Sequence, residues 1–330
     1  MPAKLPLPIA LSCGDPAGIG PEIAWKAWQV LRAEEPFFWI GDPRHLPDDC
    51  HYLKINDPEE THSAAPHGLP VVQHEFAETS SEGMPSAANA KDVVAVIRRG
   101  VDLVGSNKAS AICTAPISKK ILRDYAGFAF PGHTEYLADL AGVSQSVMML
   151  VAGEFRVVPA TVHIPISNVA NALTESLLEE TLRITHKALK YDFGISEPRL
   201  VVAGLNPHAG EGGMLGTEER ELIEPLCRRL KNEGLDVRGP LPADTMFHEK
   251  ARQSYDAAVA MFHDQALIPI KTIAFDRGVN TTLGLPFVRT SPDHGTAFDI
   301  AGKNIADPTS LIAALRLAAQ MARTRSRSTR

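Results

Sequence analysis

Three short apolar runs, each followed within three residues by a histidine, constrain the fold of this chain most strongly. The runs cover residues 157–162, 200–205 and 257–262, and the histidines are His163, His208 and His263. Runs of this length, bounded by glycine, proline and polar residues, are typical of buried β-strands. Ligands of α/β proteins gather outside the carboxyl ends of the strands, so the three imidazoles are expected to converge on one point. Three histidines with an open fourth position suit a catalytic divalent metal.

Segments typical of strands alternate along the chain with segments typical of helices, which indicates an α/β fold. Helices are expected at residues 23–34, 119–125, 176–191 and 308–323, and a further strand at residues 109–114. Ser176 and Glu179 have the spacing of a capping box. The tail, residues 323–330, is rich in arginine and serine and is expected to be a short, frayed and solvated terminus rather than a binding segment.

Composition excludes several classes of partner. With 330 residues, 44% of them hydrophobic, the chain is long enough for two domains. A net charge of -6 gives no reason to expect nucleic acid or an acidic membrane surface as partner, and no apolar run approaches the length that spans a membrane. The four cysteines are widely spaced and form no CxxC pair, which argues against a disulfide framework and fits a reducing cytoplasm.

Two loops near the ends of the chain are candidates for cofactor binding. Residues 14–22 read GDPAGIGPE, a strand-to-helix turn in which Gly14, Gly18 and Gly20 do not have the spacing of the nucleotide-binding GxGxxG turn. Residues 293–308 are rich in small residues, whose backbone can approach a flat adenine and a ribose. By themselves these features also fit a tight turn and a surface loop.

Both loops resemble the corresponding ends of the isocitrate and isopropylmalate dehydrogenase family, which holds the adenosine of NAD without a Rossmann fold. The resemblance is sharper in the middle of the chain. Residues 130–137, 205–213, 261–271 and 277–291 are similar, in order, to motifs of the 4-hydroxythreonine-4-phosphate dehydrogenases of vitamin B6 synthesis. Two departures are visible: Ala266 stands where members often have glycine, and the tail is extra.

The resemblance implies a set of site residues. His163, His208 and His263 match the metal ligands of the family, with one histidine supplied across a homodimer interface. The residues that match its substrate-binding positions are His133, Thr134, Lys271, Asn280 and Arg289. Asp244 or His133 is the expected base, and the expected contacts to NAD or NADP are Gly295, Thr296, Asp299 and Asn304. Histidine ligands favour zinc, while magnesium, cobalt and manganese remain open.

Four of the five substrate-binding positions also have a simpler interpretation. Lys271 and Arg289 could be solvated surface charges, Asn280 a turn residue after Gly278, and Thr134 the N-cap of a helix. A phosphorylated and carboxylated substrate nevertheless requires cations of this kind.

The resemblance implies oxidation of 4-(phosphooxy)-L-threonine and decarboxylation to 3-amino-2-oxopropyl phosphate, in the synthesis of pyridoxal 5'-phosphate. The alternatives are a dehydrogenase of threonate or erythronate 4-phosphate, a metal-dependent hydrolase and a non-catalytic binder of phosphorylated metabolites. The implied fold is a two-domain α/β subunit of the isopropylmalate dehydrogenase type. Residues 1–137 with 291–330 would form the first domain and residues 138–290 the second, with the active site in their cleft at a dimer interface.

Overall fold

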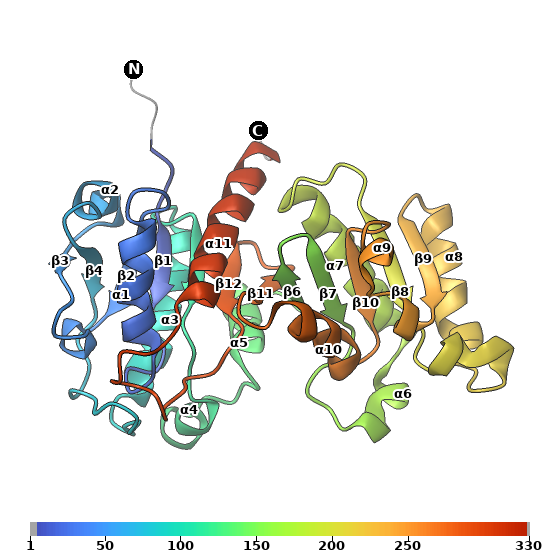
Figure 1. Cartoon of the computed structure of the whole chain (residues 1–330), viewed down its shortest axis with the longest axis horizontal. Coiled ribbons are helices and arrows are strands. Elements are labelled where there is room, and N and C mark those ends of the chain that lie inside the picture. The colour runs from blue at the N-terminus through green and yellow to red at the C-terminus, as the bar shows by residue number, and fades with distance from the viewer. Residues whose placement is uncertain (1–4, 329–330) are drawn as a thin grey trace. The chain divides into compact units, whose positions relative to one another are not determined.

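A computed structural model gives the structure of residues 5–328. These residues form two units. The first comprises the chain up to Ser144 together with Leu285–Arg323, and the second comprises Gln145–Gly284 with the chain from Thr324 onward. Strands and helices alternate along both units (Figure 1), which confirms the expected α/β class.

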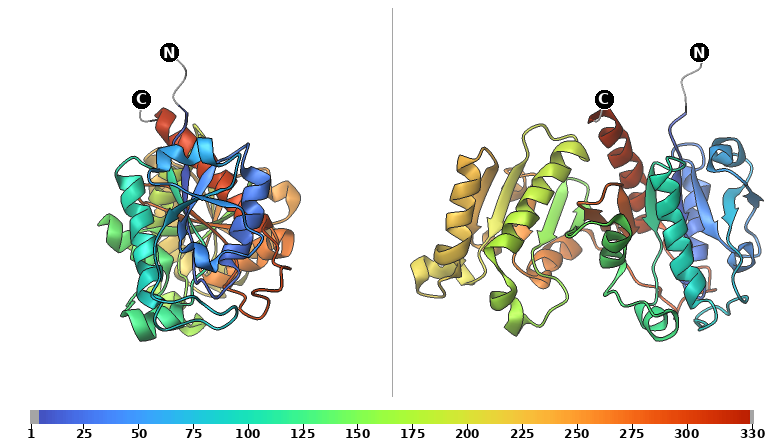
Figure 2. Two further views of the ribbon diagram at one scale, coloured as in Figure 1. Left: turned by 90° about the vertical axis from the view of Figure 1, so that its left-hand side faces the viewer. Right: turned by 180° about the vertical axis from the view of Figure 1, so that it is seen from behind.

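The sheet of the first unit is parallel at every pairing. Its spatial order is β3 (Tyr52–Lys54), β4 (Leu69–Gln73), β2 (Phe37–Gly41), β1 (Ile9–Ser12), β5 (Ala111–Thr114) and β12 (Arg289–Pro292). The helices are α1 (Gly20–Leu31), α2 (Thr61–Ala64), α3 (Ala90–Gly105), α4 (Lys119–Ala126), α5 (His133–Ala141) and α11 (Thr309–Ser328). Figures 1 and 2 show α1 and α3 on opposite faces of this sheet. Covering both faces explains why the central strands are buried along their whole length and are apolar except for the last residues of β1 and β5.

The sheet of the second unit is mixed. Its spatial order is β11 (Val279–Leu283), β6 (Val147–Ala152), β7 (Phe155–Pro159), β10 (Ala257–Ala260), β8 (Arg199–Ala203) and β9 (Asp236–Leu241). The pairings of β6 are antiparallel, and those from β7 to β9 are parallel. The helices are α6 (Val169–Ala172), α7 (Glu175–Tyr191), α8 (Glu224–Asn232), α9 (Glu249–Arg252) and α10 (His263–Ala274). In Figures 1 and 2, α7 and α10 cover opposite faces.

Two local expectations are wrong. Helix α7 is capped by Thr174, whose hydroxyl accepts from the backbone of Leu177, because Thr174 has the extended backbone that an N-cap needs and Ser176 already lies inside the helix. The tail is helical up to Ser328, since α11 continues through it. Arg323 pairs with Glu35 and Arg325 with Asp192, which holds this last stretch in place. Residues 329–330 lie outside the described part.

Among residues 5–328, every helix is too short or too polar to cross a membrane. All four cysteines are free thiols and are buried.

Candidate active site

Two of the three candidate metal ligands lie side by side in the second unit. Strands β7 and β10 are parallel neighbours, so the chain leaves both at the same edge, and a hydrogen bond of 2.8 Å from Ala160 N to Ala260 O extends the pairing beyond the strands. The ring centroids of His163 and His263 are 5.9 Å apart. Two imidazoles bound to one tetrahedral zinc have centroids roughly 5 Å apart, given Zn–N bonds of about 2 Å. The observed separation is about 1 Å wider than this, so the two rings are close enough to share a metal after a small approach.

The orientation of His263 also fits metal binding. It is the first residue of α10, and its Nδ1 lies 2.7 Å from Oδ1 of the neighbouring Asp264. A carboxylate that accepts from Nδ1 leaves the lone pair of a neutral ring on Nε2. Nε2 is then the atom that can bind a cation.

His208 does not join this pair within one chain. It follows β8 on a turn of unusual backbone and is exposed. Among residues 5–328, no three His, Cys, Asp or Glu side chains come together as a metal site. The chain therefore brings together His163 and His263, and His208 stands apart from them.

Three further candidates lie in the second unit. Asp244 is exposed in a short turn after β9, and Lys271 lies on α10, with Nζ 5.7 Å from the ring centroid of Phe275. Asn280 lies on β11, paired with Leu150 of β6, so its interpretation as a turn residue is wrong. The strand begins directly after Gly278 because Val279–Leu283 has an edge of β6 to pair with.

Arg289 is a buried cation of the first unit. It opens β12, only 2% of its surface is exposed, and Nε and Nη2 donate to the hydroxyl of Thr114 at 3.2 and 2.7 Å. Thr114 ends β5, which pairs with β12 in parallel. Burial lowers the pKa of Arg289 to about 10, so the guanidinium remains charged at neutral pH. The interpretation of Arg289 as a solvated surface charge is therefore wrong.

His133 lies near this cation and is neutral. Burial and then the positive charges of Arg289 and Lys119 hold its pKa well below the usual value of 6.5. Its buried Nε2 has no hydrogen-bond partner within the described chain. Since α5 begins at His133 with Gly132 as its N-cap, Thr134 is inside the helix and its interpretation as the N-cap is wrong. A neutral imidazole with an unused nitrogen beside a buried cation can hold an anionic, hydroxylated ligand.

The two glycine-rich loops of the first unit contact each other. The backbone of Ile19 donates to Thr296 O at 3.0 Å, and a Cβ added to Gly18 would lie 2.7 Å from that oxygen, so only glycine allows this approach. The backbone at Gly295 is open, because a Cβ there would meet no atom within 4 Å. Asp299 and Asn304 are exposed farther along this loop. An accessible backbone flanked by polar side chains fits an adenosine.

Hydrogen bonds from α1 hold the end of this loop, and the two residues that make them were not predicted from the sequence. Glu22 on α1 is buried and accepts from the backbone of Ala306 at 2.8 Å. Lys26, one turn later, donates to Glu22 at 2.7 Å and to the carbonyls of Asn304 and Ala306 at 3.1 and 3.0 Å. We call Glu22 and Lys26 the α1 clasp. The signal in the sequence was an i, i+4 Glu–Lys pair directly after a glycine-rich turn.

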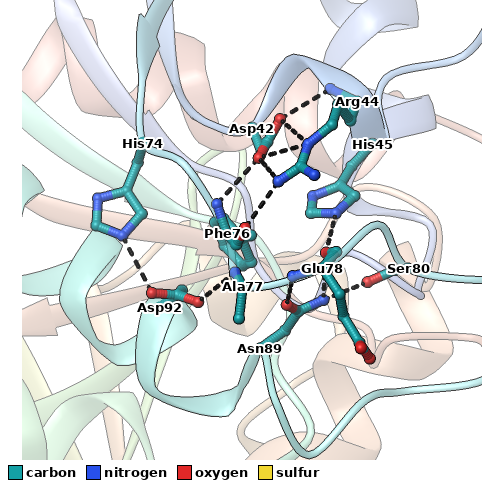
Figure 3. A network of polar contacts seen from close by, with 10 residues as sticks. All are labelled: Asp42, Arg44, His45, His74, Phe76, Ala77, Glu78, Ser80, Asn89 and Asp92. Atoms are coloured by element: carbon teal, nitrogen blue, oxygen red, sulfur yellow. Dashed lines mark hydrogen bonds and ion pairs between the residues drawn. The ribbon is translucent and has the colours of Figure 1, made fainter.

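A polar network holds a segment that contacts the first glycine-rich loop (Figure 3). Asp42, which directly follows β2, accepts from the backbone of Phe76 at 2.9 Å and from the guanidinium of Arg44. Asn89 accepts from the backbone of Glu78 at 3.1 Å. These bonds fix the segment between β4 and α3, residues 74–89. Gly83 in this segment donates to Ala17 O at 2.7 Å, so the network reaches the first glycine-rich loop.

Comparison with known proteins identifies the family. Residues 33–318 match the model of the pyridoxal phosphate biosynthetic protein PdxA. The chain belongs to this family. It is 58% identical over 320 residues to the 4-hydroxythreonine-4-phosphate dehydrogenase of Ruegeria sp. (strain TM1040), covering 97% of this chain and 98% of the relative.

Solved structures agree with this assignment to the PdxA family. The enzyme of the same name from Klebsiella pneumoniae superposes with a TM-score of 0.87 at 35% identity, covering 96% of this chain and 99% of that chain. Isocitrate dehydrogenase from Methylococcus capsulatus has a TM-score of 0.51 at 15% identity, covering 98% of this chain and 88% of that chain. The second likeness concerns the fold alone and confirms its isocitrate dehydrogenase-like class.

Proposed function

We propose that this PdxA-family protein oxidises 4-(phosphooxy)-L-threonine with NAD or NADP and decarboxylates the product to 3-amino-2-oxopropyl phosphate. The observation that carries the proposal is the similarity over nearly the whole chain to relatives named 4-hydroxythreonine-4-phosphate dehydrogenase. The protein acts in the cytoplasm, where its four buried free thiols persist.

His163, His208 and His263 would hold one divalent metal, with zinc favoured over magnesium, cobalt or manganese by the imidazole donors. The spacing of the first and third rings supports this assignment. When bound, a divalent metal supplies the Lewis acidity that lowers the pKa of a hydroxyl and polarises a ketone. The loop with Gly295, Thr296, Asp299 and Asn304 would hold the nicotinamide cofactor.

The remaining residues bind and orient the substrate. Arg289 presents a planar fork and Lys271 a point charge to the anionic oxygens of the substrate. Thr134 and Asn280 add hydrogen bonds to its polar groups. His133, neutral at physiological pH, is poised to accept a proton, and Asp244 is the alternative base.

The active form is a homodimer with shared sites. Large exposed apolar residues lie near each metal histidine in the sequence: Ile164 and Ile166 follow the first, Met214 and Leu215 follow the second, Ile268 lies on the helix that begins at the third, and Phe275 directly follows that helix. Exposed apolar side chains of this size are typical of surfaces that a partner covers. Because one chain pairs His163 with His263, the third ligand of each site is His208 from the other subunit.

The test is spectrophotometric. NADH or NADPH formation is followed with 4-(phosphooxy)-L-threonine, threonate 4-phosphate and erythronate 4-phosphate, each with and without added metal. The proposal expects the highest kcat/KM for the threonine derivative and loss of turnover after chelation. A higher kcat/KM for threonate or erythronate phosphate would reassign the substrate. Consumption of a substrate without formation of NADH or NADPH would favour a hydrolase. If none of the three compounds reacts, the alternative of a non-catalytic binding protein is favoured.

A further inference from the structure

The turn that carries His208 has a left-handed backbone. From His208 to Gly213 six consecutive residues have positive φ, including the non-glycine residues His208 (53°), Ala209 (52°) and Glu211 (43°). Each L-residue in this conformation costs about 1–2 kcal/mol. Contacts elsewhere in the fold must therefore hold the turn.

A buried carboxylate lies against the turn. Glu219 opens the short helix Glu219–Ile223 and is 4% exposed. Its two oxygens accept from Asn206, Oε1 from the backbone N at 2.7 Å and Oε2 from Nδ2 at 3.0 Å. A Cβ added to Gly210 would lie 2.6 Å from Oε2, so the carboxylate touches the turn itself. Asn206, two residues before His208, is held by this carboxylate and by Glu218, whose Oε2 accepts from Nδ2 at 2.7 Å.

A side chain of α10 connects this region to the segment of His263. Gln265 Oε1 accepts from the backbone of Met261 at 2.6 Å, and its Nε2 donates to Gly204 O at 2.8 Å. Met261 directly follows β10 and Gly204 directly follows β8. Gln265 therefore joins the two strand ends from which the histidine segments depart.

Glu219 also reaches Gly204. A Cβ there would lie 3.2 Å from Glu219 Oε1 and 2.7 Å from the Cα of Ala209, so the chain after β8 is enclosed between the carboxylate and the turn. Gln265 holds the same glycine through its carbonyl. Glu219 and Gln265 therefore both contact the backbone at Gly204.

We propose that Glu219 and Gln265 are positioning residues that set how His208 and His263 are presented to a divalent metal. Neither residue is a metal ligand. Both oxygens of Glu219 accept hydrogen bonds from Asn206, and the amide of Gln265 accepts from Met261 and donates to Gly204. Replacing residues that orient metal ligands without binding the metal lowers metal affinity by about 10–100-fold. The inference rests on the proposed metal site.

The experiment measures binding of Zn²⁺ to the metal-free full-length protein by competition with a chromogenic chelator. Glu219→Gln replaces one of the two carboxylate oxygens that accept from Asn206 by an NH₂ group, which cannot accept a hydrogen bond. Gln265→Met keeps the length of the side chain but removes its hydrogen bonds. We expect the Kd for Zn²⁺ to rise about 10–100-fold in both variants. Glu221→Gln, which changes an exposed glutamate of the same short helix, is the matched control and should bind like wild type.

Two further measurements separate positioning from simple loss of fold. The Co²⁺ absorption spectrum should shift in the Glu219→Gln and Gln265→Met variants, and excess metal should restore turnover. Wild-type affinity and an unshifted spectrum in either folded variant would overturn the inference. If Glu219→Gln does not fold, Gln265→Met decides by the same criteria; if neither folds, their role is structural and the inference fails. Absence of Zn²⁺ binding by wild type would instead overturn the metal site of the proposed function.

Discussion

At the scale of single residues, burial decides the charge states of two proposed substrate-binding residues, Arg289 and His133. Arg289 keeps its charge although it is buried, since Thr114 accepts two of its N–H groups and its pKa falls only to about 10. His133 is neutral because burial and two neighbouring cations act in the same direction on its pKa. One fixed cation and one neutral base in the same region suit the deprotonation of a hydroxyl on an anionic substrate.

Replacing Arg289 by lysine tests the need for the planar fork. Lysine retains the charge but cannot bind Thr114 and an anionic oxygen in the same geometry. A lost hydrogen bond to a charged group is worth about 1.5–3 kcal/mol, so kcat/KM for the phosphorylated substrate should fall roughly 10–150-fold. The measurement is steady-state kinetics with circular dichroism as the check on folding. Arg316→Lys, which changes an arginine in a surface ion pair with Glu34, is the control. If the two changes lower kcat/KM equally, Arg289 does not bind the substrate.

At the scale of elements, helix α1 fixes a loop that lies far away in the sequence. Lys26→Met removes the cation of the α1 clasp and leaves its apolar stem. Loss of two bonds to the loop carbonyls should weaken NADH binding by about 1 kcal/mol, or roughly fivefold, with kcat within about twofold of wild type. Fluorescence titration with NADH measures the Kd. Lys91→Met, an exposed lysine at the start of α3, should leave it unchanged; an unaltered Kd in Lys26→Met would contradict a role of the clasp in cofactor binding.

The network around Asp42 gives a pH-dependent contribution to stability. Burial opposes ionisation, but hydrogen bonds from Arg44 and from the backbone of Phe76 lower the pKa of Asp42 from 3.8 to about 2. A carboxyl with a lowered folded-state pKa stabilises the protein above its unfolded pKa, and this contribution is lost as pH falls from about 4 to 2. Urea unfolding should find Asp42→Asn less stable than wild type by about 1–2 kcal/mol at pH 6, with the gap closing toward pH 2. A gap that does not depend on pH would contradict this origin.

At the scale of the whole molecule, shared sites predict complementation between inactive subunits. Mixtures of His163→Ala and His208→Ala should regain activity, because in a mixed dimer one site receives both defects and the other receives none. At equal mixing about half of the dimers are mixed, so recovery near a quarter of wild-type activity is expected for independent sites.

The pairing of His163 with His263 in one chain supplies the control. Mixtures of His163→Ala and His263→Ala should stay inactive, because every site then lacks at least one ligand of that pair. Recovery in this second mixture, or none in the first despite subunit exchange, would show that the ligands are divided differently between the subunits.

The sequence by itself determined the α/β class, the strand ends that carry the three histidines and the glycines of the loop near β1. These follow from local rules: period and length of apolar runs set the strands, and glycine marks a turn or a close approach. The motifs also carried the family resemblance, which the match over residues 33–318 confirms.

Only the tertiary structure decided which of these residues meet and in what state. The left-handed turn at His208 is held by Glu219 through Asn206, and the state of His133 depends on Arg289, which lies 156 positions later in the sequence. The extended helix α11 likewise depends on Asp192 and Glu35. Backbone conformation, burial and pKa at these positions are set by partners that are remote along the chain, and a local pattern contains no information about them.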